Sequence, residues 1–149
     1  QSMHFAFLFN WAKKPWLTQK WSRSIMDRYY GTGVANAYLG DEDQGQMSAW
    51  FVMAALGLFQ TDGGCRVNPI YEIASPLFEK VVINLGGLYG RGDSFIIEAK
   101  NVSRKNKYIQ SAILNGQKLN TFYFQASELL RGGKLILVMG DQPNHLWGI

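Results

Sequence analysis

The chain has 149 residues, of which 47% are hydrophobic and 14% aromatic, and this is enough for one domain with a packed core, in which two sub-regions are possible. Its net charge of +4 comes from basic residues scattered along the sequence, so nothing indicates nucleic-acid binding, and no apolar run is long enough to indicate a membrane partner. The single cysteine, Cys65, excludes an internal disulfide and a thiolate metal cluster, and we interpret it as a small, partly buried apolar residue.

Residues 3–12 predict the first helix. Apolar side chains recur there at the i, i+3, i+4 and i+7 spacing of an amphipathic helix. These side chains are Phe5, Leu8, Phe9 and Ala12. Phe7 and Trp11 widen the apolar face, so this helix is expected to need neighbours on nearly all sides.

A second helix is predicted from Pro15 to about Tyr30, because the missing N–H of proline suits the first position of a helix. Trp21, Ile25 and Tyr29 share one face at the i, i+4, i+8 spacing, and we expect them to form the packing stripe of this helix. Four charged side chains are expected to face water: Lys20, Arg23, Asp27 and Arg28.

An acidic loop precedes the third predicted helix. Residues 47–58 carry no charged side chain and are apolar on every side of a helical wheel, which is typical of a buried helix. Asp41, Glu42 and Asp43 stand just before it, between two glycines. The acids are therefore expected at the helix N-terminus, whose unpaired N–H groups help to keep nearby carboxylates ionised.

The acidic loop allows three interpretations. Side chains at i and i+2 of an extended loop point the same way, so Asp41 and Asp43 can face one cleft while Glu42 faces the other side. A pair of carboxyl groups suits the hydrolysis of glycosidic bonds, and clustered oxygen ligands suit calcium. The third interpretation is that the acids only cap the helix and add solubility.

From Ile70 onward the apolar residues recur with a period of two, which predicts strands separated by turns. The apolar runs are residues 71–74, 80–85, 95–99, 108–114, 121–124 and 134–139. Asn115-Gly116 is a strong hairpin-turn signal, and residues 127–131 predict one helical turn. We therefore expect an antiparallel sheet or sandwich in this half of the chain.

One turn contains the tripeptide Arg91-Gly92-Asp93, which adhesion receptors read in other proteins. Glycine and aspartate are favoured in turns for backbone reasons, and this explains the tripeptide without adhesion. His145 likewise indicates no function, and we interpret it as an isolated surface histidine.

Four ordered motifs span most of the chain. Residues 40–50 read Gly-Asp-Glu-Asp-Gln-Gly-Gln-Met-Ser-Ala-Trp, and residues 10–19 read Asn-Trp-Ala-Lys-Lys-Pro-Trp-Leu-Thr-Gln. Residues 75–78 read Ser-Pro-Leu-Phe, and residues 108–116 read Tyr-Ile-Gln-Ser-Ala-Ile-Leu-Asn-Gly. In these motifs the sequence resembles glycoside hydrolase family 92, whose members are calcium-dependent, exo-acting α-mannosidases, many of them α-1,2-mannosidases.

The resemblance implies an α+β chain. Residues 1–66 would form the last helices of a catalytic (α/α)6 barrel, and residues 67–149 an antiparallel β region packed on it. Family members are several times longer, so the chain is expected to be a C-terminal portion, with the general-acid glutamate upstream. An incomplete barrel leaves apolar faces bare, which predicts contact with the missing N-terminal part of the parent chain or self-association.

The resemblance also implies roles for single residues. Asp43 is expected to be the general base of an inverting hydrolysis, and Asp41 to share or orient the attacking water. Four residues are expected to bind substrate: Glu42, His4, Trp16 and Gln46. The expected cofactor is Ca²⁺, and most of its protein ligands are expected upstream of Gln1, so no ligand is assigned in this sequence.

The expected partner is a mannose-containing glycan, in keeping with N-glycan degradation in the periplasm or outside the cell. The fragment alone is expected to be inactive, because it lacks the acid. The alternative is a non-catalytic carbohydrate-binding or adhesive module whose acids hold calcium without turnover.

Overall fold

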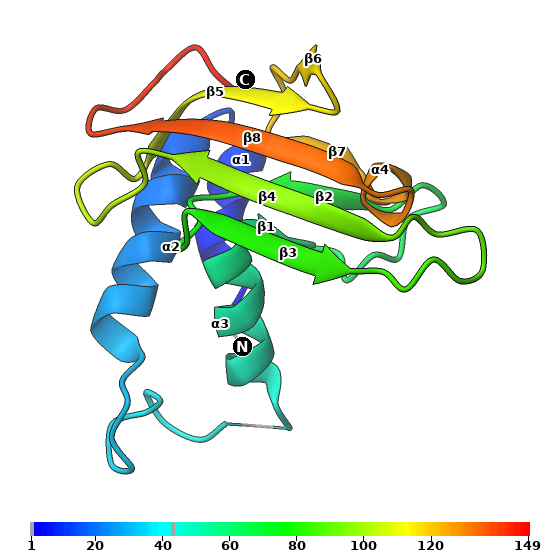
Figure 1. Cartoon of the computed structure of the whole chain (residues 1–149). Coiled ribbons are helices and arrows are strands. Elements are labelled where there is room, and N and C mark those ends of the chain that lie inside the picture. The colour runs from blue at the N-terminus through cyan, green and yellow to red at the C-terminus, as the bar shows by residue number, and fades with distance from the viewer. Residues whose placement is uncertain (1, 43) are drawn as a thin grey trace.

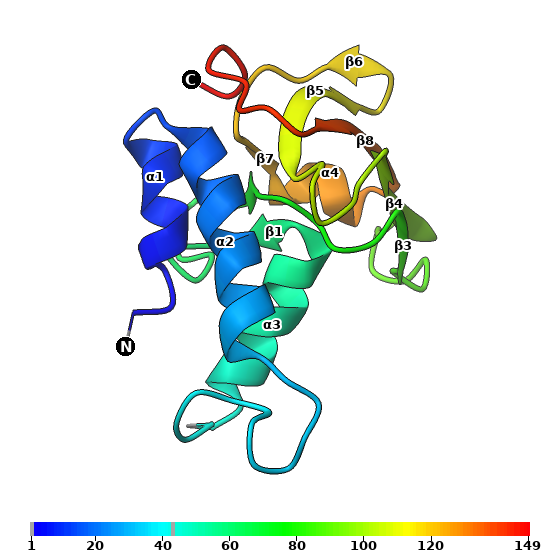
Figure 2. The same ribbon diagram turned by 90° about the vertical axis from the view of Figure 1, so that its left-hand side faces the viewer.

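The computed structural model describes residues 2–42 and 44–149, which form a helical part beside two β-sheets (Figure 1). The helical part contains the 3₁₀ helix η1 (Phe5–Phe7) and the α-helices α1 (Leu8–Trp11), α2 (Pro15–Tyr29) and α3 (Gln46–Leu56). The predicted first helix is therefore one 3₁₀ turn followed by one α turn. Figure 2 shows α2 between α1 and α3. Within the described residues, no helix is both long and apolar enough to cross a membrane.

The buried face of α2 is largely polar. Its buried residues are Pro15, Thr18, Gln19, Ser22, Arg23 and Met26. The predicted packing stripe is wrong for this chain, because Trp21 and Tyr29 are 38% and 40% exposed. The polar face instead contacts the backbone of the β region, where the side-chain oxygen of Gln19 accepts a hydrogen bond from the amide of Ile109 at 2.9 Å.

Arg23, predicted to face water, is only 4% exposed. Its guanidinium donates hydrogen bonds to the carbonyl of Pro76 at 2.6 Å and to that of Ser103 at 3.1 Å. Burial lowers the pKa of Arg23, and the Asp27 carboxylate acts in the opposite direction. Polar groups can be buried where they find such partners, so the carbonyl groups of two loops determine which face of α2 turns inward.

Helix α3 is buried on one side only. Its buried residues are Trp50, Ala54 and Ala55, whereas Val52 on another face is 55% exposed. The prediction of a helix buried on every side is therefore wrong for the chain as it stands. The helix ends at Gly57, which has φ +80° and lies so close to Pro76 that a Cβ would come within 2.9 Å of the proline ring.

Two sheets share the main core. The strands are β1 (Leu58–Phe59), β2 (Ile70–Ile73), β3 (Lys80–Asn84), β4 (Ser94–Lys100), β5 (Tyr108–Leu114), β6 (Gln117–Lys118), β7 (Tyr123–Gln125) and β8 (Gly133–Gly140), with α4 (Ala126–Leu130) between the last two. The strand order is β1-β2-β7 in the smaller sheet and β3-β4-β8-β5-β6 in the larger. Ile73 and Phe124 of the smaller sheet belong to the same buried cluster as Phe95 and Leu137 of the larger.

The α+β class is confirmed, but the larger sheet is mixed. Strands β4 and β8 run parallel, with Phe95 opposite Gly133, and the other pairs are antiparallel. The prediction of a purely antiparallel sheet is wrong at this pair. The chain leaves the larger sheet to form β7 in the smaller one, so β8 does not follow its sheet neighbours through a hairpin. Helix α4 then returns the chain to the larger sheet beside the start of β4, where the amide of Gly92 donates to the carbonyl of Leu130 at 2.9 Å.

Two local predictions about the loops have opposite outcomes. The Asn115-Gly116 hairpin between β5 and β6 is confirmed, since both residues have the positive φ angles, +49° and +84°, that the tightest hairpin turns require. Cys65 is exposed rather than partly buried. Its loop, between β1 and β2, is held on the outside of the molecule, where Asp62 and Arg66 form an ion pair.

Glu72 on β2 connects the helical part to the sheets and is 1% exposed. One carboxylate oxygen accepts a hydrogen bond from the Asn10 side chain at 3.1 Å, and the other accepts one from the Trp11 indole at 3.1 Å. Thr61 donates both its amide and its hydroxyl to that second oxygen. Because β1 also pairs with β2, residues on both sides of the expected boundary at 66/67 share a sheet, and the division into 1–66 and 67–149 stays a prediction.

We expect the substitution Glu72→Gln to lower the free energy of unfolding of the chain by about 2–4 kcal/mol, because an NH₂ group would then face donors that need an acceptor. Urea denaturation measures this change. Glu79→Gln removes the same charge from an exposed position and should change the free energy by less than about 0.5 kcal/mol. Equal effects of the two substitutions would show that the buried network does not stabilise the fold.

Candidate active site

The acidic loop lies where the chain passes from α2 to α3, at the end of the helical part remote from the sheets (Figure 1). A cavity of about 450 Å³ opens beside it, a volume within the range of small-molecule sites. Its lining comes from the N-terminal segment, α2, the loop and the first turns of α3: Ser2, Met3, Ile25, Tyr29, Tyr30, Leu39, Asp41, Gln46, Met47 and Trp50. Two predicted site residues, Asp41 and Gln46, are thus brought together.

Aromatic rings form one wall of the cavity. Tyr30 stacks on Trp50 with ring centroids 5.6 Å apart and an interplanar angle of 11°. The Trp50 indole donates a hydrogen bond to the carbonyl of Met3 at 2.6 Å, which holds the N-terminal segment against α3. The Tyr30 hydroxyl donates to the carbonyl of Met47 at 3.1 Å. The sequence indicated an aromatic excess here, but the pairing of Tyr30 with Trp50 depends on how α2 and α3 cross.

Burial raises the pKa of Tyr30 to about 12, and the negative charge of Glu42 and the neighbouring Tyr38 act in the same direction. The phenol therefore stays protonated throughout the neutral range and remains a hydrogen-bond donor to the backbone of α3.

The first two acids of the loop are directed differently. Asp41 lines the cavity. Both carboxylate oxygens of Glu42 instead accept from the amide of Ser48, at 3.0 and 3.2 Å. This divergence agrees with the alternation expected for the loop. Asp43, the predicted general base, lies outside the described residues, so its geometry stays a prediction.

His4 and Trp16 are not among the residues that line the cavity. His4 is half-buried just before η1, and its ring packs edge-on against Phe5 with centroids 5.1 Å apart. Trp16 lies in the first turn of α2, about 20 Å along the helix axis from Tyr29 at the cavity. Its ring packs against His145 with centroids 4.3 Å apart. The structure thus separates Trp16 from Asp41. The substrate-binding roles predicted for His4 and Trp16 stay predictions.

The described residues hold no cluster of acidic, histidine or cysteine side chains of the kind that binds a metal ion. Among residues 2–42 and 44–149 there is no group of three or more His, Cys, Asp or Glu side chains that could hold a metal ion. Asp41 and Gln46 line the cavity, but Glu42 already accepts from the backbone.

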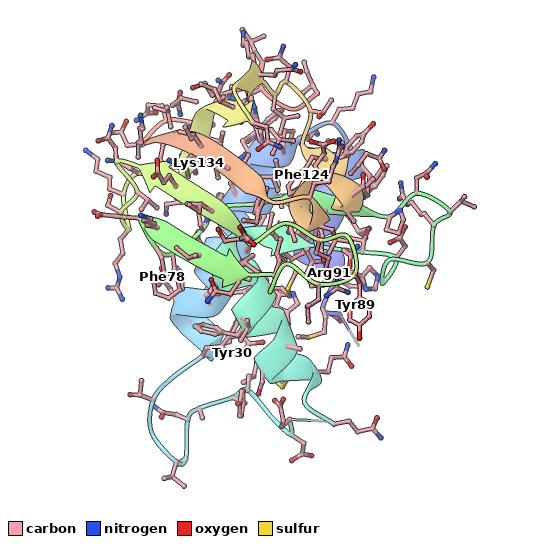
Figure 3. The ribbon with its side chains drawn as sticks, turned by 45° about the vertical axis from the view of Figure 1, so that its right-hand side comes forward. Tyr30, Phe78, Tyr89, Arg91, Phe124 and Lys134 are labelled. Carbon is pink, nitrogen blue, oxygen red and sulfur yellow. The ribbon has the colours of Figure 1, made fainter. Side chains whose placement is uncertain are left out.

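The Arg91-Gly92-Asp93 tripeptide belongs to the β3–β4 loop, and Figure 3 shows Tyr89 and Arg91 there, away from Tyr30 at the helical end. The amide of Gly87 donates to the carbonyl of Gly92 at 3.2 Å, and the amide of Arg91 donates to that of Leu88 at 3.1 Å. These bonds give the loop the turn structure that the sequence indicated.

The raised pKa of Tyr30 predicts a pH dependence of stability. The phenol has a pKa near 10 in the unfolded chain and about 12 in the folded one, so its contribution is present below pH 10 and is lost as the pH rises toward 12. We expect the stability difference between wild type and Tyr30→Phe to shrink over that interval. Denaturation at several pH values measures it, and a difference that stays constant from pH 9 to 12 would contradict the shift.

Comparison with known proteins identifies the family. A model of the glycosyl hydrolase family 92 catalytic domain matches residues 1–141. A family GH92 α-mannosidase from Bacteroides thetaiotaomicron superposes with a TM-score of 0.85 at 34% sequence identity, over 97% of this chain and 18% of its own. The same enzyme in complex with mannoimidazole gives 0.86 at 34% identity, over 99% of this chain and 18% of its own.

Two further relatives agree. A family GH92 inverting mannosidase from Bacteroides thetaiotaomicron gives a TM-score of 0.85 at 38% identity, over 99% of this chain and 19% of its own. A protein of Arthroderma benhamiae, described as an uncharacterized secreted glycosidase, is 31% identical over 147 residues, which are 95% of this chain and 18% of the relative. The chain thus spans less than a fifth of the length of these relatives, and it belongs to glycosyl hydrolase family 92.

Proposed function

We propose that the chain supplies the general-base loop of an exo-α-mannosidase that hydrolyses mannose-containing glycans, with α-1,2 linkages as the expected substrates. The observation that carries the proposal is the position of Asp41, whose side chain lines an aromatic cavity at the start of α3 in a chain that belongs to family 92. Similar chains are α-mannosidases, one of them solved with mannoimidazole and another described as inverting.

The proposed reaction is a single displacement with inversion. One carboxylate deprotonates a water molecule that attacks the anomeric carbon, while a carboxylic acid on the other face protonates the leaving oxygen. We assign the base to Asp43 and the orientation of the water to Asp41. Gln46 also lines the cavity and is suited to bind a sugar hydroxyl.

The general acid is proposed to come from another part of the parent chain. Among the described residues that line the cavity, Asp41 is the one acidic side chain. Glu42 accepts from a backbone amide, and Glu72 is buried in its own network. The two carboxyl groups of an inverting enzyme stand roughly 6.5–9.5 Å apart, so the acid would have to approach from across the open cavity.

The bare surface of the helical part supports this dependence on further chain. An apolar groove of about 630 Å³ runs between the N-terminal helices and α2, lined by Phe5, Ala6, Leu8, Phe9, Ala12, Trp21 and Ile25. Phe5 is 58% exposed and Leu8 is 44% exposed. Exposed apolar surface of this kind usually receives a partner. We propose that the other helices of an (α/α)6 barrel cover it in the parent chain, and that self-association does so in their absence.

Calcium and location complete the proposal. Calcium would take most of its protein ligands from the remainder of the parent chain, since the described residues contain no group of three or more His, Cys, Asp or Glu side chains that could hold it. A periplasmic or extracellular location, and a role in N-glycan degradation, would agree with the secreted relative.

The carboxylate roles predict a large loss of turnover. In the complete parent chain, Asp43→Asn should lower kcat for an α-mannoside by about 10³-fold or more, because amide nitrogen cannot accept the proton from water, and Asp41→Asn by about 10- to 100-fold. Steady-state hydrolysis of an α-1,2-linked mannobiose measures both. Arg91→Ala, in the β3–β4 loop, is the control and should leave kcat unchanged. A fully active Asp43→Asn variant would remove Asp43 from the mechanism.

Chelation and truncation test the remaining parts. We expect EDTA to abolish hydrolysis by the parent chain and added Ca²⁺ to restore it, and we expect the 149-residue chain to be inactive under every condition. Activity of the parent chain after EDTA would exclude a required metal. Hydrolysis by the 149-residue chain would show that an acid within it completes the pair, and binding of mannosides without hydrolysis by the parent would favour a carbohydrate-binding module.

A further inference from the structure

We propose that Glu42 is a positioning residue, which acts by fixing the loop to the first turn of α3 and thereby orienting Asp41 beside it. This inference rests on the proposed function, because it assigns the orientation of the base loop to a carboxylate that does not itself react. It differs from the substrate-binding role expected for Glu42 from the family resemblance, and the experiment below separates the two roles.

Glu42 accepts a bifurcated hydrogen bond from a single backbone donor. Both oxygens of Glu42 accept from the amide of Ser48, at 3.0 and 3.2 Å. Ser48 is the third residue of α3, so its amide has no partner within the helix. The first bond of the helical ladder runs from the amide of Ala49 to the carbonyl of Gly45 at 3.0 Å. Glu42 therefore satisfies a donor that the helix leaves free, and the helix dipole favours its negative charge there.

Two tyrosines also form hydrogen bonds to the same turn. The Tyr30 hydroxyl donates to the carbonyl of Met47 at 3.1 Å, and the Tyr38 and Ser48 hydroxyls are hydrogen-bonded at 2.7 Å. Tyr30 and Tyr38 also contact each other edge-on, with ring centroids 6.1 Å apart. Residues 30–42 are thus attached to the first turn of α3 by three side chains, although the described residues between α2 and α3 contain no helix or strand.

The position of the reacting group follows from this attachment. Asp41 precedes Glu42 directly and lines the cavity, so releasing Glu42 from Ser48 would free the backbone that aims the Asp41 carboxylate. Asp43 follows Glu42 directly in sequence but lies outside the described residues, so the effect is expected through Asp41. Displacing a catalytic group by about 1 Å can cost about 100-fold in rate. The expected effect is therefore on turnover and not on affinity.

The experiment compares Glu42→Ala and Glu42→Gln in the complete parent chain. The alanine variant should lower kcat about 10- to 100-fold and change KM less than about twofold, because it removes the anchor but no substrate contact. The glutamine variant keeps one oxygen that can accept from Ser48, and should recover kcat to within about threefold of wild type. Glu79→Gln, the exposed control of equal charge change, should leave both constants unchanged.

A second measurement follows the contact without using activity. Hydrogen-exchange mass spectrometry on peptides covering residues 44–52 should show faster exchange in the alanine variant, by about tenfold at the start of α3, and near wild-type exchange in the glutamine variant. Unchanged exchange in Glu42→Ala would overturn the proposed anchor. The Glu42→Ala variant of the parent chain must also keep the thermal unfolding midpoint of the wild type, so that general unfolding does not explain the faster exchange.

The outcomes separate the proposals. A glutamine variant with KM raised tenfold and kcat unchanged would make Glu42 a substrate-binding residue and overturn the positioning role. Wild-type kcat in the alanine variant would overturn it as well. A wild-type parent chain that does not hydrolyse α-mannosides would contradict the proposed function, while the exchange measurement would still support or overturn the attachment of Glu42 to Ser48.

Discussion

The buried carboxylate of Glu72 is the interaction on which the placement of the cavity depends. A charge inside a protein is tolerated only where its oxygens accept enough hydrogen bonds, and Asn10, Trp11 and Thr61 donate to this one. Two of these donors come from the end of α1, so the N-terminal helices are fixed to β2. Phe7 then stacks on Phe59 with centroids 4.1 Å apart, and the Met3 carbonyl meets the Trp50 indole that lines the cavity.

The same kind of polar attachment explains why so much apolar surface is left outside. Helix α2 turns Gln19 and Arg23 toward the backbone of the β region, so Trp21 and Tyr29 face outward on the opposite side. A helix that has partners on two faces can form polar contacts on one face and apolar contacts on the other face. The described chain contains the polar partner, and the apolar groove next to α1 marks where the second partner is proposed to lie.

Two neighbouring carboxylates of the acidic loop have different surroundings. Asp41 faces the cavity, and Glu42 turns back to the amide of Ser48. In this arrangement Asp41, which is proposed to orient the water, stands beside Glu42, which is hydrogen-bonded to the backbone of α3. Tyr30, which remains a neutral donor because burial raises its pKa to about 12, adds a second attachment to the same turn. The cavity therefore has an aromatic wall that these contacts hold in place.

The sequence by itself determined the features that depend on local interactions. Pro15 began α2, the period of two located most strands, Asn115-Gly116 formed the hairpin turn, and the acidic motif stood at the start of α3 as expected. The family followed from the same motifs, because they span the chain in order. These signals are reliable since backbone geometry and side-chain alternation act between residues that are close in sequence.

Only the tertiary structure decided the features that depend on distant partners. The buried face of α2 was set by the carbonyls of Pro76 and Ser103, which lie more than 50 residues away from Arg23. The parallel pairing of β4 with β8 required α4 to cross from one sheet to the other. Trp16 lies in the first turn of α2, whereas Asp41 lines the cavity with Tyr29 at the other end of that helix, because a helix converts separation in sequence into distance. Such contacts leave no periodic signal, since each depends on where a remote segment of backbone presents its hydrogen-bonding groups.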